Sequence, residues 1–191
     1  MKKRFVICTL MIALSTPAFA GPNEKAETKS GETIELKAGA DAPAFKIMDA
    51  TGKEIDLAEL TKKGPVLVRL TCGCAGCDVE LPYFQALHEA YKDKGLVSLA
   101  VFAEPDETFA KYAESKKLNM RYALDPKRES WKVFGTKTMP SNFLIDQGGK
   151  IVAVSKGCNP KGLNALALGN QAAKLVSADE VDLTQSVQPQ L

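Results

Sequence analysis

The sequence predicts an α/β fold with a mixed β-sheet, and two observations carry that prediction. Apolar segments typical of strands buried on both faces, 66–70 and 96–102, alternate with segments of helical spacing. Two later strands, 142–145 and 150–154, flank the turn Asp146-Gln147-Gly148-Gly149 and are predicted to form a hairpin. Alternating strands and helices that end in a hairpin and a helix place parallel and antiparallel neighbours in one sheet.

The other elements follow from side-chain periodicity and from the residues that end each segment. We expect a hairpin at 45–48 and 54–57, helices at 76–94, 106–117, 128–134 and 161–176, and a short strand at 120–124. Gly95 and Gly135 end two of these helices, because glycine readily adopts the backbone conformation that closes a helix. Pro82 falls inside the first helix and is expected to kink it.

The first 20 residues have the organisation of a secretory signal peptide. Lys2-Lys3-Arg4 supply a positive start, Phe5–Leu14 an apolar run of ten residues, and Ala18-Phe19-Ala20 a cleavage site. That run is too short for a membrane span, which needs about 20 apolar residues. We therefore predict a periplasmic or secreted protein, soluble after signal cleavage and without a stable membrane anchor.

The mature chain is expected to hold one domain, since 191 residues correspond to one domain plus flanking segments. Residues 21–40 are polar and are predicted to form a flexible leader with one short strand at 33–36. Residues 177–191 are predicted to be a disordered tail. The domain then covers 41–176.

Charge and composition exclude several classes of protein. The formal net charge of +2 becomes −1 once the three basic residues of the signal peptide are removed, so no basic surface for nucleic acid is expected. The chain has a single histidine, His88, which argues against histidine-rich metal sites. A hydrophobic fraction of 45% is that of a globular protein and excludes a disordered or fibrous chain.

The spacing of the cysteines indicates a reactive or metal-binding site rather than structural disulfides. Cys8 leaves with the signal peptide, and Cys72, Cys74, Cys77 and Cys158 remain. Three of these four lie within six residues, which is poor spacing for linking distant parts of a chain. An exported protein with clustered cysteines therefore suggests a redox site or a metal site.

Cys74 and Cys77 form a C-x-x-C motif at the point where a buried strand leads into a helix. Residues three apart on a helix share one face, and their Cα atoms lie within the roughly 4.4–6.8 Å that a disulfide needs. Cys74 is placed at the helix N-terminus, where free N–H groups stabilise a thiolate. We therefore predict Cys74 as the attacking thiol and Cys77 as the resolving thiol.

The direction of electron flow follows from the charges around the motif. Ala75 and Gly76 add no positive charge, and Asp78 and Glu80 are acids close to the pair. Nearby anions disfavour a thiolate, whereas strong oxidants stabilise one. The sequence therefore predicts a reductant.

Two segments carry a resemblance to a known family: 65–70 leading into Cys74-Ala75-Gly76-Cys77-Asp78-Val79-Glu80-Leu81-Pro82, and Phe134 to Asp146 around Pro140. Over 40–176 the chain resembles the thioredoxin fold, specifically the exported TlpA/ResA-like thiol-disulfide oxidoreductases of the redoxin group. The family pattern reads W-C-x-P-C-x-x-E-x-P, then G-x-x-x-x-P-x-x-F-L-I-D. Gly73 replaces the aromatic residue and Gly76 the proline between the cysteines.

The resemblance implies a thioredoxin-like three-layer sandwich, a central mixed sheet flanked by helices, with no cofactor and no metal. The implied partners are protein thiol or disulfide clients and an upstream electron-donor redox protein. Pro140 would be a cis-proline facing the disulfide and Met139 would pair with an extended client segment, the alternative being an ordinary trans proline. Glu80 would move a proton to or from Cys77, the alternative being a solvated glutamate in the first helical turn. Arg69, inside a strand, is expected to be paired or to reach solvent rather than to be catalytic.

The resemblance also places Cys158 beside the cis-proline loop, and hence near Cys72 and the C-x-x-C motif. Because the mature cysteine count is even, we predict that Cys72 and Cys158 form a second disulfide or pass oxidation onward from Cys74. The alternative is that each fills a small buried gap.

Three other functions stay open at this stage. Thr71 and Cys74 fit part of the P-x-x-x-T-x-x-C pattern of thiol peroxidases, but Leu67 stands where the proline belongs, and the activating arginine would be Arg69 or Arg121. The C-x-C-x-x-C run with Cys158 could bind Zn²⁺ or Cu(I), without His88. A non-catalytic binding domain on the same fold is the third.

Overall fold

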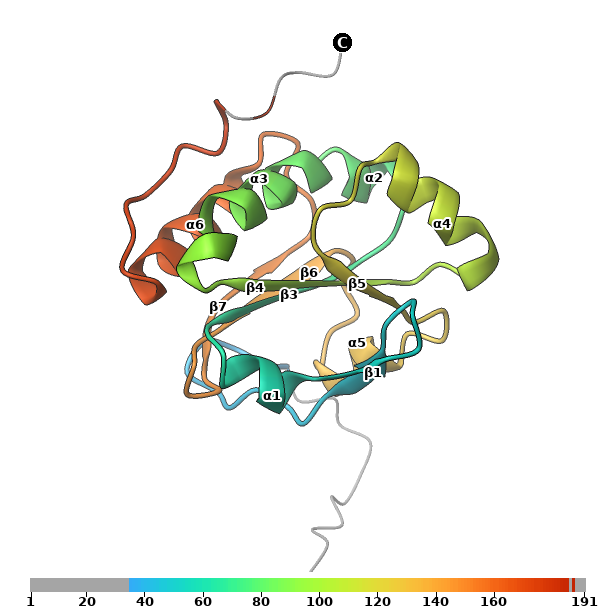
Figure 1. The fold of residues 1–191 in the computed structure, drawn as a ribbon, viewed down its shortest axis with the longest axis horizontal. Helices are drawn as coiled ribbons and strands as arrows, with labels where there is room; N and C mark the ends of the chain where they lie inside the picture. Colours follow the sequence, from blue (N-terminus) through green and yellow to red (C-terminus); the bar gives the residue numbers. More distant parts are fainter. Residues whose placement is uncertain (1–34, 186, 188–191) are drawn as a thin grey trace, which may run out of the picture. The chain divides into compact units, whose positions relative to one another are not determined.

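A five-stranded sheet forms the centre of the protein in the computed structural model, which describes residues 35–185 and 187 (Figure 1). Its strands are β3 (Val66–Thr71), β4 (Val97–Phe102), β5 (Arg121–Leu124), β6 (Ser141–Ile145) and β7 (Ile151–Lys156). They are ordered β5-β4-β3-β6-β7. The β3–β4 and β4–β5 pairs are parallel, and β6 is antiparallel to both β3 and β7. The predicted mixed sheet is confirmed.

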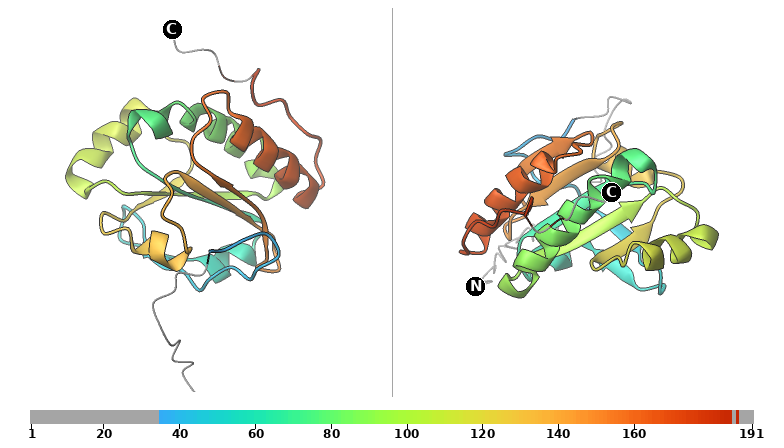
Figure 2. Two further views of the ribbon diagram at one scale, coloured as in Figure 1. Left: turned by 180° about the vertical axis from the view of Figure 1, so that it is seen from behind. Right: turned by 90° about the horizontal axis from the view of Figure 1, so that it is seen from above.

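Helices and a small hairpin cover the two faces of this sheet (Figures 1 and 2). One face carries α3 (Leu81–Tyr91), α4 (Asp106–Ser115) and α6 (Leu163–Leu175). The other carries α1 (Leu57–Thr61), α5 (Glu129–Val133) and the antiparallel pair β1 (Lys46–Met48) and β2 (Glu54–Asp56). This is the three-layer α/β sandwich that the family resemblance implies.

Side-chain alternation along β3 divides the core into two apolar clusters. Val66, Val68 and Leu70 pack on the side of α1 and α5, whereas Leu67 packs with Phe84 on the side of α3. Successive side chains of a strand point to opposite faces, so Arg69 and Thr71 lie on the α3 side as well. β3 therefore carries buried polar groups toward its carboxyl end.

The predicted helix 76–94 is wrong in its continuity. It consists of α2 (Ala75–Asp78), α3 and a 3₁₀ turn at Lys92–Lys94, with an interruption at Val79 and Glu80. Pro82 is the second residue of α3, where its missing N–H costs no helical hydrogen bond. Pro82 thus begins a new helix instead of kinking one.

A second difference is at Leu57, which was expected to end a strand and instead begins α1. The Asp56 carboxylate accepts a hydrogen bond from Ala58 N at 2.9 Å and caps this helix.

The segments that flank the domain are more closely attached than expected. Residues 178–183 are part of the fold, because Leu183 is 1% exposed in the α3–α6 cluster. The Tyr91 hydroxyl donates to Asp179 O and accepts from Val181 N, at 3.3 and 3.1 Å. On the amino-terminal side, Gly39 N donates to Ile151 O at 2.8 Å. The predicted signal peptide and most of the predicted leader lie outside the described residues.

Among the described residues, none of the helices is long and apolar enough to cross a membrane.

Candidate redox site

The cysteine motif lies where β3 passes into α2, at the carboxyl end of the central strand. Cys74 is the residue before the first turn of α2, and its carbonyl accepts from the N–H groups of Cys77 and Asp78 at 2.9 and 3.0 Å. Cys74 is exposed, whereas Cys77 is 2% exposed and Cys72 is 9% exposed. Of these three cysteines, Cys74 is therefore the one that an external disulfide can reach, and its attacking role stays a prediction.

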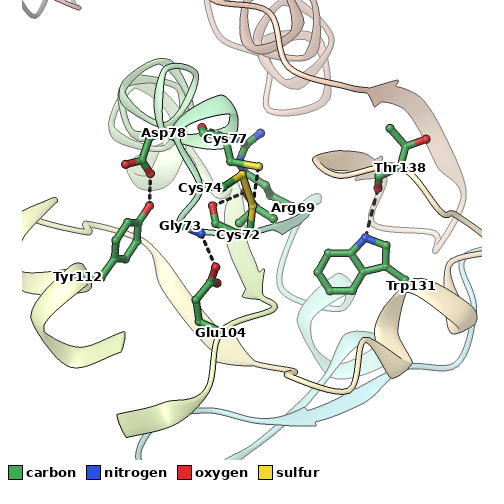
Figure 3. The surroundings of a disulfide bond; sticks show 11 residues. Arg69, Cys72, Gly73, Cys74, Cys77, Asp78, Glu104, Tyr112, Trp131 and Thr138 are labelled. Carbon is green, nitrogen blue, oxygen red and sulfur yellow. Dashed lines mark hydrogen bonds between the residues drawn. A yellow bond between two sulfur atoms is a disulfide. The ribbon is translucent and has the colours of Figure 1, made fainter. Parts of the chain in front are cut away.

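The sulfur pairing differs from the prediction (Figure 3). Cys74 is bonded to Cys72, with a Cα–Cα distance of 5.4 Å, and Cys77 is a free thiol. The Cys77 sulfur lies 3.2 Å from the Cys72 sulfur, and all three sulfurs lie within 4.8 Å of one another. Helical spacing alone had selected Cys77 as the partner of Cys74. The cysteine two residues earlier is also within disulfide reach, because the chain bends at Gly73 and the Cα atoms of Cys72 and Cys74 lie 5.4 Å apart.

The predicted Cys72–Cys158 disulfide is wrong, because Cys72 is bonded to Cys74 and Cys158 is a free, exposed thiol. The other predicted role of this pair, passing oxidation onward from Cys74, stays a prediction. Cys158 nonetheless lies beside α2, as expected. A Cβ atom built at Gly76 would be 3.8 Å from the Cys158 sulfur. The gap-filling alternative also fails for Cys158, since an exposed side chain fills no buried gap. The predicted neighbourhood is right and the predicted bond is not.

Arg69 and Glu80 form a buried ion pair that contacts the backbone of Cys77. The Arg69 Nη1 atom lies 3.1 Å from Glu80 Oε2, and the two side chains are 1% and 0% exposed. The same nitrogen donates to Asn142 Oδ1 at 2.8 Å, and Nη2 donates to Cys77 O at 3.3 Å. Arg69 is thus paired, as expected, and it connects β3 and β6 to the helix that carries Cys77.

Burial lowers the pKa of Arg69 below its usual value, and the Glu80 carboxylate opposes that change. The guanidinium also stacks on the Phe84 ring, with 4.1 Å between its central carbon and the ring centroid. These contacts hold the guanidinium inside the protein, between buried polar partners and an aromatic ring.

Glu80 is held by partners other than cysteine. One carboxylate oxygen faces Arg69, and the other accepts a hydrogen bond from Asn159 N at 3.2 Å. The alternative of a solvated glutamate in the first helical turn is wrong, since Glu80 is fully buried at the interruption between α2 and α3. Glu80 joins the α2–α3 junction to the loop that carries Cys158.

The Met139–Pro140 peptide bond is cis, as the resemblance implies. The loop is held by hydrogen bonds on both sides. Thr138 O accepts from Trp131 Nε1 at 3.2 Å and from Ser141 Oγ at 2.9 Å, and Pro140 O accepts from Gly157 N at 2.9 Å. Figure 3 shows Trp131 and Thr138 on the other side of the cysteines from Tyr112.

The sequence reading missed two residues beside the cysteines, Glu104 and Tyr112 (Figure 3). The Glu104 carboxylate accepts from Gly73 N at 2.6 Å. The Tyr112 hydroxyl donates to Asp78 Oδ1 at 2.6 Å, and burial together with Asp78 raises the pKa of this phenol. Asp78 also pairs with Lys116 at 2.7 Å. Glu104 lies 31 positions from Gly73 and Tyr112 lies 34 positions from Asp78, so no local pattern could have found them.

The glycine before Cys74 is explained by Tyr112. A Cβ atom built at Gly73 would lie 3.0 Å from Cε2 of the Tyr112 ring. The family pattern has an aromatic residue at the position of Gly73. In this protein the aromatic ring at that place is Tyr112, which belongs to α4.

The geometry bears on two of the alternatives. Within the described residues, the group of side chains that could hold a metal comprises Cys72, Cys74 and Cys77, so Cys158 does not complete a four-thiolate site. A thiol peroxidase needs an arginine that activates its cysteine, and the two candidates were Arg69 and Arg121. Arg69 is engaged by Glu80 and Asn142, and Arg121 is exposed on β5.

Comparison with known proteins finds similarity to a redoxin family model, to thiol-disulfide oxidoreductases and to a thiol:disulfide interchange protein. The AhpC/TSA family model matches residues 38–154. The thiol-disulfide oxidoreductase ResA of Bacillus thuringiensis subsp. konkukian is 33% identical over 124 residues, covering 64% of this chain and 72% of that protein. ResA of Bacillus subtilis is 29% identical over 153 residues, covering 80% and 79%. A thiol:disulfide interchange protein from Bacteroides sp. has a TM-score of 0.62 and 29% identity, covering 76% of this chain and 93% of that one.

Proposed function

This chain belongs to the AhpC/TSA family and is a thioredoxin-like thiol-disulfide oxidoreductase, and from that premise we propose that it reduces protein disulfides in the periplasm through Cys74. The observation that carries the proposal is the difference in exposure between the three clustered cysteines, Cys72, Cys74 and Cys77. Cys74 is exposed, whereas its two neighbours are buried. An external disulfide therefore meets Cys74 before either of the others.

The reaction needs no group beyond the cysteines. The Cys74 thiolate attacks one sulfur of a client disulfide, forms a mixed disulfide and releases one client thiolate. A buried thiolate of the same protein then attacks the Cys74 sulfur, forms an internal disulfide and releases the second client thiolate. Two electrons pass from the protein to the client, and an upstream dithiol must return them.

The charges around Cys74 support the reducing direction. Asp78 and Glu80 each have a cationic partner, Lys116 and Arg69, so their effect on the cysteines is partly offset. Glu104 adds a carboxylate that contacts the backbone next to Cys74. A nearby anion disfavours the thiolate, which favours the disulfide form of the protein. We expect a reduction potential nearer about −270 mV than about −120 mV.

The cis-proline loop is the proposed docking site for clients. Extended peptides bind by adding main-chain hydrogen bonds to a free backbone edge. Met139 precedes Pro140, and the hydrogen bonds of Thr138 and Pro140 hold this loop in place. The backbone of Met139 would pair with the client and so align the client disulfide with Cys74.

The test is reduction of a disulfide-bonded peptide by the protein, with dithiothreitol as the electron source. The wild type should reduce the peptide and Cys74→Ser should not. Equilibration with glutathione buffers measures the potential, and a value above about −170 mV would contradict a reductant. Consumption of hydrogen peroxide faster than of the peptide disulfide would favour the peroxidase alternative.

A further inference from the structure

We propose that Cys72 is a second resolving thiol, so that a client bound at Cys74 can be released by either of two buried cysteines. This inference rests on the proposed function and specifies how it is completed. A C-x-x-C motif alone supplies one resolving thiol, Cys77. The protein has three sulfurs at that place, and the third lies two residues before the attacking one.

The geometry of the three sulfurs carries the inference. Cys72 is bonded to Cys74, and the Cys77 sulfur lies 3.2 Å from the Cys72 sulfur. Cys72 therefore contacts both members of the C-x-x-C motif (Figure 3). Both Cys72 and Cys77 are buried, so an external disulfide cannot readily reach either of them. That placement suits a thiol that acts on a mixed disulfide formed by its neighbour.

The local structure keeps Cys72 within reach of Cys74. The Gly73 N–H is held by the Glu104 carboxylate at 2.6 Å, and the Tyr112 ring packs against Gly73 where a side chain would otherwise project. The backbone between the two cysteines is thus fixed from α4 and from the loop after β4. Cys72 itself directly follows the buried central strand.

The resolving step through Cys72 balances without another reactant. The Cys72 thiolate attacks the Cys74 sulfur of the mixed disulfide, a Cys72–Cys74 bond forms, and the client leaves as a thiolate that takes a proton from water. The client is reduced by two electrons, and the cysteine pair is oxidised by two electrons. The product is the disulfide present in the structure.

A further exchange can move this disulfide into the interior. The Cys77 thiolate attacks the Cys72 sulfur, a Cys72–Cys77 bond forms, and Cys74 leaves as a thiolate. No electrons are gained or lost in this isomerisation. It returns the exposed Cys74 to the thiol form while the disulfide is held between two buried cysteines.

The experiment measures how long the mixed disulfide survives. All variants carry Cys158→Ser, so that the other exposed thiol cannot form an adduct, and this parent is the matched reference. Reduced protein is mixed with glutathione disulfide, quenched with acid at intervals and analysed by intact mass. The parent is compared with Cys77→Ser, with Cys72→Ser and with the double variant Cys72→Ser/Cys77→Ser.

We expect the glutathione adduct to be short-lived in both single variants and to persist at least about tenfold longer in the double variant. Peptide mapping of oxidised Cys77→Ser should find the Cys72–Cys74 bond. An adduct as long-lived in Cys77→Ser as in the double variant would overturn the inference and leave the proposed function intact. Failure of the double variant to form any adduct, in a protein whose Cys74 is alkylated by iodoacetamide, would overturn the proposed function and this inference with it.

Discussion

The two faces of β3 are equally buried but chemically different. Toward α1 and α5, Val66, Val68 and Leu70 are all 0% exposed within an apolar cluster. Toward α3, Leu67 is followed by Arg69, which is 1% exposed and paired with Glu80. Burial alone would favour an apolar side chain at position 69. The apolar face packs the sheet against α1 and α5, whereas the polar face connects the sheet to the helix that carries Cys77.

The largest expected effect on stability comes from removing the cation of the buried ion pair on the polar face. Arg69→Met should lower the free energy of unfolding by about 3–5 kcal/mol, because it leaves the buried Glu80 carboxylate without its cation. Urea unfolding measures the loss. The double variant Arg69→Met/Glu80→Met should recover much of it, since an apolar pair can replace a buried ion pair. Equal destabilisation of the single and double variants would contradict the ion-pair explanation.

A smaller effect is expected on the apolar face. Val68→Ala removes two methyl groups from a fully buried site and should cost about 2 kcal/mol. The folded variant should reduce a disulfide peptide at the wild-type rate, because the Val68 side chain faces away from α3. A loss of rate in Val68→Ala, measured below its unfolding transition, would show that the two faces are not functionally separate.

The contact between Gly73 and Tyr112 allows a third test, at the carboxyl end of β3 where the cysteines lie. Gly73→Ala should destabilise the protein by roughly 1–2 kcal/mol, because its Cβ would lie 3.0 Å from the Tyr112 ring. The same substitution in a Tyr112→Leu background should cost little. A thermodynamic cycle of the four proteins measures the coupling, and additive costs would mean that the ring is not the obstacle.

The smallest effect is expected at the far end of α3. Tyr91→Phe removes the hydroxyl that contacts Asp179 and Val181, and should cost about 1 kcal/mol. Proteolysis within 177–185 should become faster in this variant, while peptide reduction stays unchanged. Unaltered proteolysis would show that the Tyr91 hydroxyl does not hold this segment and that its other contacts, Leu183 among them, do.

The sequence predicted the sheet well, because strands buried on both faces leave long apolar runs such as 66–70. It failed at the α2–α3 interruption, where the Arg69–Glu80 pair joins side chains of two different elements. The region around Cys74 was predictable from the C-x-x-C spacing. The bond between Cys74 and Cys72 was not predictable, because the backbone conformation across 72–77 sets which sulfurs meet, and residue spacing does not contain that conformation.

Glu104 and Tyr112 illustrate the same limit. Their positions beside Gly73 depend on how α4 and the loop after β4 pack over the sheet. No spacing within the cysteine motif contains that information, which arises only from tertiary packing.

The central claim is that Cys74 is the thiol through which this protein reduces disulfides. The most direct measurement is the steady-state rate of peptide disulfide reduction by Cys74→Ser beside that of Cys158→Ser, both starting from an exposed cysteine. The account predicts that Cys74→Ser loses nearly all activity and that Cys158→Ser retains the wild-type rate. Wild-type activity in Cys74→Ser, or its loss in Cys158→Ser alone, would contradict the account.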